Sequence, residues 1–447
     1  MKIMCASNNP FTVSVFETEV SAVSSFQRIL LYILFISFAV PLVLEVSIGD
    51  FRLPVYVFDA PLFVLLFLWY INICIGKAKV RISLLDVVFV LFLAWIFVTA
   101  FTGLDPLYSL RRVMLWLRAY LLFALLYNTR LREGDLLRIT ALLLFTQIPV
   151  ALLQFATQSS IGALNQYFGQ KGGIVTIFKM GNEIITRVQG TFPNSNVLYL
   201  WLILLLPVVQ SYWNLKAIKK STSKLLRLLW FGGVVVLLLT LSRAGIAAGI
   251  VGFAVEMALR NRYIRKLREP TYRSWFWLLL AVSTALLITE YWFPTGSPLV
   301  ARLFRLEDPK RAYFLEEAIH VITEHPLLGV GYDNFVLAMP KESFPSVIRS
   351  RAGVHNIPLR ITAETGIPGG ILFMFLIALL LRRVYNSLKY VPAHTRPLLI
   401  GMVAGIISYV IAIQFDVLFN HHSILPLFFA LTGATLGLGR RALYGNV

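Results

Sequence analysis

The chain contains 447 residues, of which 58% are hydrophobic and 14% are charged, and its mean hydropathy is +0.75. A soluble domain carries roughly 25% charged residues, so this composition excludes a soluble globular protein and predicts an all-α polytopic membrane protein. The formal net charge of +19 would indicate nucleic-acid binding in a soluble protein. In a membrane protein it indicates basic cytoplasmic loops and sites for acidic ligands, with membrane lipids and no nucleic acid as partners.

Apolar runs long enough to cross a bilayer recur along the chain. A crossing needs about 20 apolar residues, and candidate spans lie at residues 29–46, 54–75, 82–103, 108–127, 136–157, 196–213, 274–292, 367–383, 397–415 and 423–438. The run 228–259 is too long for one crossing, and both of its flanks are strongly basic. The positive-inside rule therefore predicts a helical hairpin there, with Arg243 at its outer tip, and about twelve spans in total.

The remaining basic loops agree with one orientation, in which both termini are cytoplasmic. Residues 1–447 are then a single multi-pass membrane domain. Two long segments, 158–195 and 293–366, fall on the outer side. Loops longer than about 15 residues are usually functional or disordered. We expect both to be ordered, and the larger one to be helical.

The sequence contains no GxxxxGK[ST], HExxH, CxxC or DxD motif, so we expect neither a metal nor a cofactor. The GVG at Gly329–Gly331 follows a predicted helix ending at His325 and is interpreted as a C-cap turn rather than a phosphate loop. Glycine pairs at GxxxG spacing, Gly245/Gly249, Gly401/Gly405 and Gly433/Gly437, predict close helix packing.

Two arginines stand in apolar surroundings on the outer side. Arg243 is at the hairpin tip, where an arginine needs a partner or access to water. Arg311 falls near the middle of the apolar arc of a predicted helix over 308–325, an arc that includes Phe314, Leu315 and Ile319. Both positions favour binding of an external anion. Snorkelling to headgroups for Arg243, and a structural salt bridge for Arg311, are the alternatives.

Arg187 and His355 each lie before a predicted span, on the same outer side as Arg243 and Arg311. Arg187 lies in RVQGTFPNSN, and a solvated loop arginine is the simpler explanation for that residue alone. His355 lies just above the membrane, before ITAETGIPGG. Histidine titrates near neutral pH and therefore suits general-base catalysis, although a structural role is the commoner one for a single histidine.

Five segments in this order, RVQGTFPNSN, LTLSRAG, RAYFLEEA, HPLLGVGYDNF and HNIPLRITAETGIPGG, resemble those of the O-antigen ligase and polymerase superfamily of bacterial glycosyltransferases. The resemblance covers the whole chain in span number and loop layout, and its motifs run from Arg187 to Gly370. Phe314 stands where many members have tryptophan, a conservative departure.

The resemblance implies an inverting, metal-independent glycosyltransferase of the GT-C type in the inner (cytoplasmic) membrane of a bacterium, with 158–195 and 293–366 as periplasmic loops. The donor would be a glycan on undecaprenyl diphosphate, and the acceptor a sugar hydroxyl of lipid A-core on the periplasmic side. Arg187, Arg243 and Arg311 resemble the arginines that bind the donor diphosphate. His355 resembles the essential histidine and would act as the general base, with Arg243 and Arg311 as catalytic partners.

The sequence does not identify the acceptor, so alternative activities stay open. An O-antigen polymerase would use a second lipid-linked repeat, and a protein O-oligosaccharyltransferase would use protein hydroxyls, with the same donor chemistry. A lipid-linked glycan flippase would need polar residues along a path across the bilayer, whereas Asp59, Asp86 and Glu256 are scattered. This distribution favours surface chemistry over transport.

Overall fold

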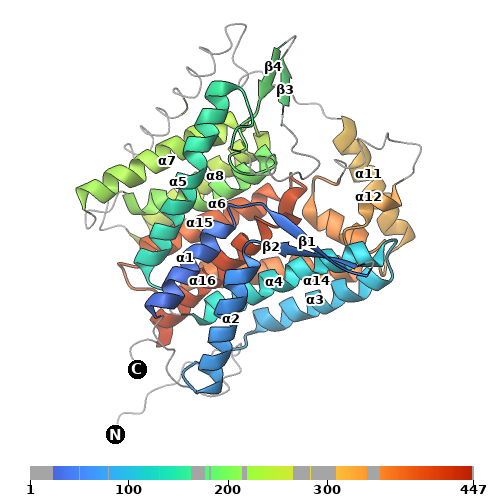
Figure 1. The fold of residues 1–447 in the computed structure, drawn as a ribbon, viewed down its shortest axis with the longest axis horizontal. Helices are drawn as coiled ribbons and strands as arrows, with labels where there is room; N and C mark the ends of the chain where they lie inside the picture. Colours follow the sequence, from blue (N-terminus) through green and yellow to red (C-terminus); the bar gives the residue numbers. More distant parts are fainter. Residues whose placement is uncertain are drawn as a thin grey trace.

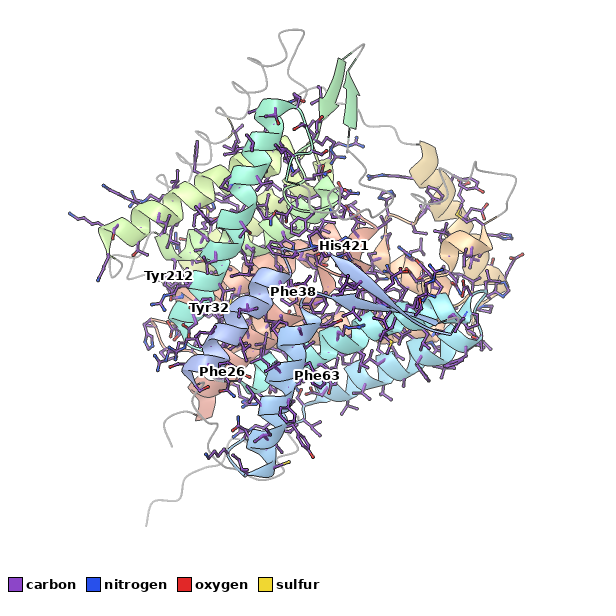
Figure 2. The ribbon with its side chains drawn as sticks, viewed as in Figure 1. Phe26, Tyr32, Phe38, Phe63, Tyr212 and His421 are labelled. Atoms are coloured by element: carbon purple, nitrogen blue, oxygen red, sulfur yellow. The ribbon has the colours of Figure 1, made fainter. Side chains whose placement is uncertain are left out.

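The computed structural model describes residues 24–49, 51–78, 80–129, 131–162, 177–180, 183–213, 219–264, 282, 309–339 and 353–444. The main helices are α1 (Ser25–Ser37), α2 (Asp59–Cys74), α3 (Leu84–Phe101), α4 (Pro106–Asn128), α5 (Glu133–Thr157), α6 (Ser195–Trp213), α7 (Lys220–Leu239), α8 (Arg243–Tyr263), α14 (Ile357–Ser387), α15 (Arg396–Ala412) and α16 (Leu425–Tyr444). Two further helices, α11 (Pro309–Glu324) and α12 (Phe335–Ala338), lie beside one end of the bundle (Figure 1).

Six of these helices, α3, α5, α6, α7, α8 and α14, are long and apolar enough to cross a membrane. The apolar helices α1, α2 and α15 and the apolar part of α16 are shorter. The chain is therefore a mainly helical polytopic membrane protein, as predicted from composition. The expected span at 274–292 lies, apart from Val282, outside the described residues, and the count of about twelve remains a prediction.

The fold also contains two antiparallel β-hairpins, so the all-α prediction was wrong in this respect. Strands β1 (Val43–Ile48) and β2 (Phe51–Tyr56) form the first hairpin, and β3 (Ile177–Met180) and β4 (Glu183–Thr186) form the second. The expected span at 54–75 consequently begins later, at Asp59 of α2. A short apolar run fits a strand as well as a helix, and periodicity alone does not separate them.

The bundle has two distinct ends. At one end, here called the basic end, α4 and α16 finish side by side, with the Arg440 guanidinium 3.4 Å from Asn128 Oδ1, and α1 and α5 begin side by side, with Arg28 3.4 Å from Asp135. In Figure 1 the start of α1 and the end of α16 lie on the same side, away from α11 and α12. The terminal helices therefore share one end of the bundle.

Helix α6 is the centre of the bundle, because nearly all of its residues are buried. It packs against α15, α7, α8 and α5. A Cβ on Gly401 or Gly405 of α15 would collide with the α6 backbone, and a Cβ on Gly433 of α16 would collide with the Phe123 carbonyl of α4. The close packing predicted from glycine spacing is thereby confirmed for these helices.

Candidate active site

The loop that carries Arg187 is held by two glutamines of α5. Gln147 and Gln154 are two helical turns apart and therefore project from the same face. Gln154 Oε1 accepts hydrogen bonds of 2.9 Å from the backbone N–H groups of Gln189 and Gly190, and its Nε2 donates to the Gly190 carbonyl at 2.7 Å. Gln147 Oε1 accepts from Thr191 N at 3.0 Å. These amides replace a regular backbone ladder for the loop.

Arg187 joins this loop to the connection between α7 and α8. Its Nε donates to the Thr240 carbonyl at 2.7 Å, and its Nη2 donates to Asn196 Oδ1 at 3.1 Å. Thr240 caps the carboxyl end of α7, where carbonyl groups lack helical partners and favour a cation. Arg187 is therefore a partly buried cross-link rather than a solvated loop residue.

Arg243 is the first residue of α8 and is partly buried. The turn Thr240–Ser242 separates α7 from α8, and Ser242 caps α8 by accepting a 3.2 Å hydrogen bond from Gly245 N. The two helices of the expected hairpin 228–259 contact each other and share α6 as a neighbour, while α7 also packs against α5 and α8 against α15. Arg187 thus binds the turn three residues before Arg243.

A buried tyrosine connects this turn to the segment after α15. A Cβ on Gly245 would overlap the Tyr199 ring, so the ring lies directly against the first turn of α8. Tyr199 Oη donates a 2.5 Å hydrogen bond to Asp416 Oδ2, and Asp416 Oδ1 accepts from Val417 N at 2.7 Å and Leu418 N at 3.0 Å. Tyr199 of α6 therefore links the Arg243 turn to residues 416–418.

The same segment holds the backbone around His355. The Ile357 N–H donates to the Ile413 carbonyl at 3.1 Å, and a Cβ on Gly353 would lie 3.2 Å from Val417 Cγ1. Asn356 caps α14 by accepting from Leu359 N at 3.0 Å. His355, which is partly buried, is therefore fixed just before the start of α14, next to the segment that Tyr199 connects to α8.

Arg311 borders a small second core that also reaches His355. This core, here called the outer core, joins α11 to the first part of α14 and consists of Phe314, Ala318, Val321, Val330, Phe335, Met339, Val354 and Ala363. Arg311 is partly buried and lies three residues before Phe314, on the same helical stripe. Val354 is the immediate neighbour of His355, so the two predicted site residues flank one hydrophobic core.

The apolar arc expected on this helix is narrower in the structure. Leu315 and Ile319, which were placed on the buried side, are 45% and 52% exposed. Helix α11 packs mainly against α14. The outer core therefore covers a single stripe of α11 rather than a broad face.

Helix α14 is broken at Gly366, where φ is 73° and ψ is 174°. The carbonyls freed by the break are satisfied from outside the helix. Val330 N donates to Ala363 O at 3.2 Å, Gly331 N to Glu364 O at 2.9 Å, and the Trp95 indole N–H to Thr365 O at 2.9 Å. Broken helices within membrane proteins need such partners.

The GVG segment has a role beyond the turn that was predicted. Helix α11 ends at Glu324, and Gly329 N–H donates to the His325 carbonyl at 3.0 Å, so a turn does follow the helix. Gly329 and Gly331 have φ values of 64° and 96° and also place the segment against the carboxyl end of the first part of α14.

A buried charge cluster lies beside this break, and sequence reasoning missed it. Arg112 Nε of α4 is 2.6 Å from Asp333 Oδ2, the Arg360 guanidinium contacts Asp333 Oδ1, and Arg360 Nε is 2.7 Å from Glu364 Oε1. Burial by itself raises the pKa of Asp333, but the positive charges of Arg112 and Arg360 outweigh it and hold that pKa below its ordinary value. The Arg360 and Glu364 spacing of four residues was the available sequence signal.

Among the described residues, no group of three His, Cys, Asp or Glu side chains is placed to hold a metal ion. Parts of both predicted periplasmic loops, residues 163–176, 181–182, 293–308 and 340–352, lie outside the described residues.

Comparison with known proteins locates the chain by family. A solved structure described as "Structural coordination of polymerization and crosslinking by a peptidoglycan synthase complex" is similar with a TM-score of 0.41 and 18% sequence identity, covering 79% of this chain and 97% of that chain. No curated protein matches the chain. Residues 228–374 match the family model described as O-antigen ligase, and they include Arg243, Arg311 and His355. The match supports the resemblance of this part of the chain to the O-antigen ligase superfamily.

Proposed function

We propose that the protein is an O-antigen ligase, which transfers a glycan from undecaprenyl diphosphate to a sugar hydroxyl of lipid A-core. The family indicates a glycosyltransferase of a bacterial membrane that uses a lipid-linked glycan. The observation that carries the proposal is a series of contacts that connects the arginine segments to the His355 segment. Arg187 binds the turn before Arg243, and Tyr199 and Asp416 join that turn to the segment beside His355.

In this proposal Arg187, Arg243 and Arg311 bind the donor diphosphate. Guanidinium groups form paired hydrogen bonds with phosphate oxygens and keep their charge at any physiological pH. Because the leaving diphosphate gains negative charge as the glycosidic bond breaks, the same groups stabilise the transition state more than the ground state. Arg243 also stands at the amino end of α8, where the helix dipole favours an anion.

His355 is proposed as the general base. It accepts the proton of the acceptor hydroxyl while that oxygen attacks the anomeric carbon, and the bond from this carbon to the diphosphate oxygen breaks. A single displacement opposite the leaving group inverts the anomeric configuration. The products are the glycosylated acceptor, undecaprenyl diphosphate and a proton on His355. This mechanism uses no metal, and its site faces the periplasm, with both termini cytoplasmic.

Single substitutions test these roles in purified protein. His355→Ala should abolish transfer while donor binding persists, whereas Arg243→Ala and Arg311→Ala should weaken both binding and rate. Two exposed residues serve as matched controls: His320, 62% exposed on α11, and Arg138, 71% exposed near the basic end. Sustained transfer by His355→Ala would refute the base assignment, and a strict requirement for a divalent ion would refute the metal-free mechanism.

The acceptor decides between the ligase and its alternatives. One enzyme preparation with a polyprenyl-diphosphate glycan should be offered lipid A-core, a second lipid-linked repeat and a protein with exposed hydroxyls. Glycosylation of lipid A-core alone supports the ligase. Glycosylation of the repeat or of protein supports the polymerase or the oligosaccharyltransferase. Movement of the donor across a vesicle membrane without any transfer would instead identify a flippase.

A further inference from the structure

The buried cluster of Arg112, Asp333, Arg360 and Glu364, here called the charge lock, connects three elements that are distant in sequence. Arg112 comes from α4, Asp333 from the segment after the GVG turn, and Arg360 and Glu364 from the first part of α14. Asp333 is 5% exposed and Glu364 is fully buried. Buried charges are retained only when each has a partner, so the geometry of these elements is tightly constrained.

The backbone of Asp333 is also held in an unusual conformation. Its φ is 61°, in the left-handed region that residues other than glycine seldom adopt. The Asp333 N–H donates to Glu364 Oε2 at 2.9 Å, so the carboxylate of Glu364 fixes the backbone while the arginines fix the side chain. A strained backbone that several contacts hold in place is often found at functional positions.

The charge lock reaches the elements that hold His355. Arg360 lies in the first turn and a half of α14, five residues after His355, and its Nη1 donates to the Val417 carbonyl at 3.5 Å. Arg112 Nη2 donates to the Asn420 carbonyl at 3.4 Å. The segment that contacts Gly353 and holds Ile357 is therefore fastened from both sides by arginines of the lock.

We propose that Asp333 is a positioning residue that sets the place of His355 relative to the bundle by locking α14 and residues 413–420 onto α4. Asp333 carries this role because it alone in the cluster bonds to arginines of both α4 and α14. The inference rests on the proposed function, in which His355 is the base. Arg187 and Arg243 stand on other elements, so we expect loss of the lock to slow transfer more than it weakens donor binding.

The test is Asp333→Asn, because asparagine has the same shape and also tolerates positive φ. Its amide NH2 would face the guanidinium of Arg112 or Arg360 in place of a carboxylate oxygen. A displacement of about 1 Å at a catalytic group can slow a reaction about a hundredfold. We expect kcat to fall by about ten- to a hundredfold, while the Kd for undecaprenyl diphosphate changes less than about twofold.

Asp59→Asn is the matched control. Asp59 also pairs with an arginine of α4, with its Oδ1 2.8 Å from Arg118 Nε, but this pair fastens α2 and β2 rather than α14. The control should lower thermal stability and leave kcat and donor binding near their original values. An equal loss of kcat in Asp59→Asn would overturn the proposal, because the effect would then reflect general destabilisation.

Hydrogen–deuterium exchange tests the same proposal without substrate. Asp333→Asn should accelerate exchange in residues 353–365 and leave residues 187–198 unchanged, while Asp59→Asn should change neither region. Unchanged exchange at 353–365, an unchanged kcat, or an equal loss of donor binding would each refute the positioning role. If Asp333→Asn does not fold, Arg112→Lys, which keeps the charge but loses the aligned guanidinium, is measured in its place.

These measurements test the proposed function and the positioning role of Asp333 separately. Absence of glycan transfer by the unmodified protein would refute the proposed function, and the exchange measurement would still decide whether Asp333 holds the His355 segment. Normal transfer together with unchanged kcat in the variant would refute the positioning role alone.

Discussion

The break in α14 gives the most demanding prediction, which concerns Gly366→Ala. The φ of 73° and ψ of 174° at this position belong to a region that is essentially restricted to glycine and costs other residues about 1–3 kcal/mol. A Cβ would also collide with the Leu327 carbonyl. The neighbouring chain would have to move, and the hydrogen bonds from Ile367 N to Pro326 O at 2.8 Å and from Gly331 N to Glu364 O at 2.9 Å would be lost or strained.

An unsatisfied buried backbone group costs about 1–3 kcal/mol, so the substitution should destabilise the fold by about 2–6 kcal/mol when both effects are added. The assay is unfolding in detergent micelles, followed by tryptophan fluorescence, at equal protein concentration. Gly134→Ala in α5 is the control, because nothing lies within 4 Å of its Cβ position. It should stabilise the protein by about 0.5–1 kcal/mol. A Gly366→Ala protein that unfolds within about 1 kcal/mol of the original would refute the reasoning.

Three further outcomes are expected. Burial, together with nearby Arg112, lowers the pKa of His422 to about 3, so this histidine stays neutral in the fold but takes a proton in the unfolded chain below about pH 6.5. The contribution of His422 to stability is therefore present well above pH 6.5 and falls as the pH drops, by about 1.4 kcal/mol at pH 5.5. His422→Phe, which can still stack on Tyr56 at 4.9 Å, should reduce this slope in unfolding measured from pH 7.5 to 5.5; an unchanged slope would contradict the assignment. Gln154→Leu should accelerate hydrogen exchange in residues 185–191 about tenfold or more, since each lost bond is worth about 1 kcal/mol, and unaltered protection would show that the loop is held otherwise. Tyr199→Phe leaves Asp416 with one fewer hydrogen-bond donor and should lower the free energy of unfolding by about 1–3 kcal/mol in the same assay. Unchanged stability would contradict this role of Tyr199.

Parts of the fold could be predicted because composition and local pattern determine them. Few charges and repeated apolar runs require a membrane-spanning bundle, since only paired backbone groups are tolerated in lipid. The glycines of α15 and α16 pack against neighbouring backbones as their spacing predicts, because only glycine allows so close an approach. The β1–β2 hairpin was missed, since its short apolar run reads equally well as the beginning of a helix.

The candidate site was predictable only as a set of separate residues. Arg243 and Arg311 attracted attention because arginine is costly in apolar surroundings, and the family model covers both, with His355. Nothing in the sequence indicated that Arg187 would bind Thr240, or that Gln147 and Gln154 would hold its loop. These bonds join residues that are between 35 and 53 positions apart, and local patterns carry no information at that separation.

The sequence by itself determined a polytopic helical membrane protein, and it singled out three arginines and one histidine as candidate site residues; residues 228–374 also match the O-antigen ligase family model. Only the tertiary structure decided how these residues meet. Tyr199 and Asp416 connect the Arg243 turn to the His355 segment, and Asp333 connects α4 to α14. The physical reason is that periodicity and hydropathy fix which face of each helix is buried, whereas a buried polar group is satisfied by whichever partner the packing brings within hydrogen-bond distance. The identity of that partner therefore depends on how the helices assemble.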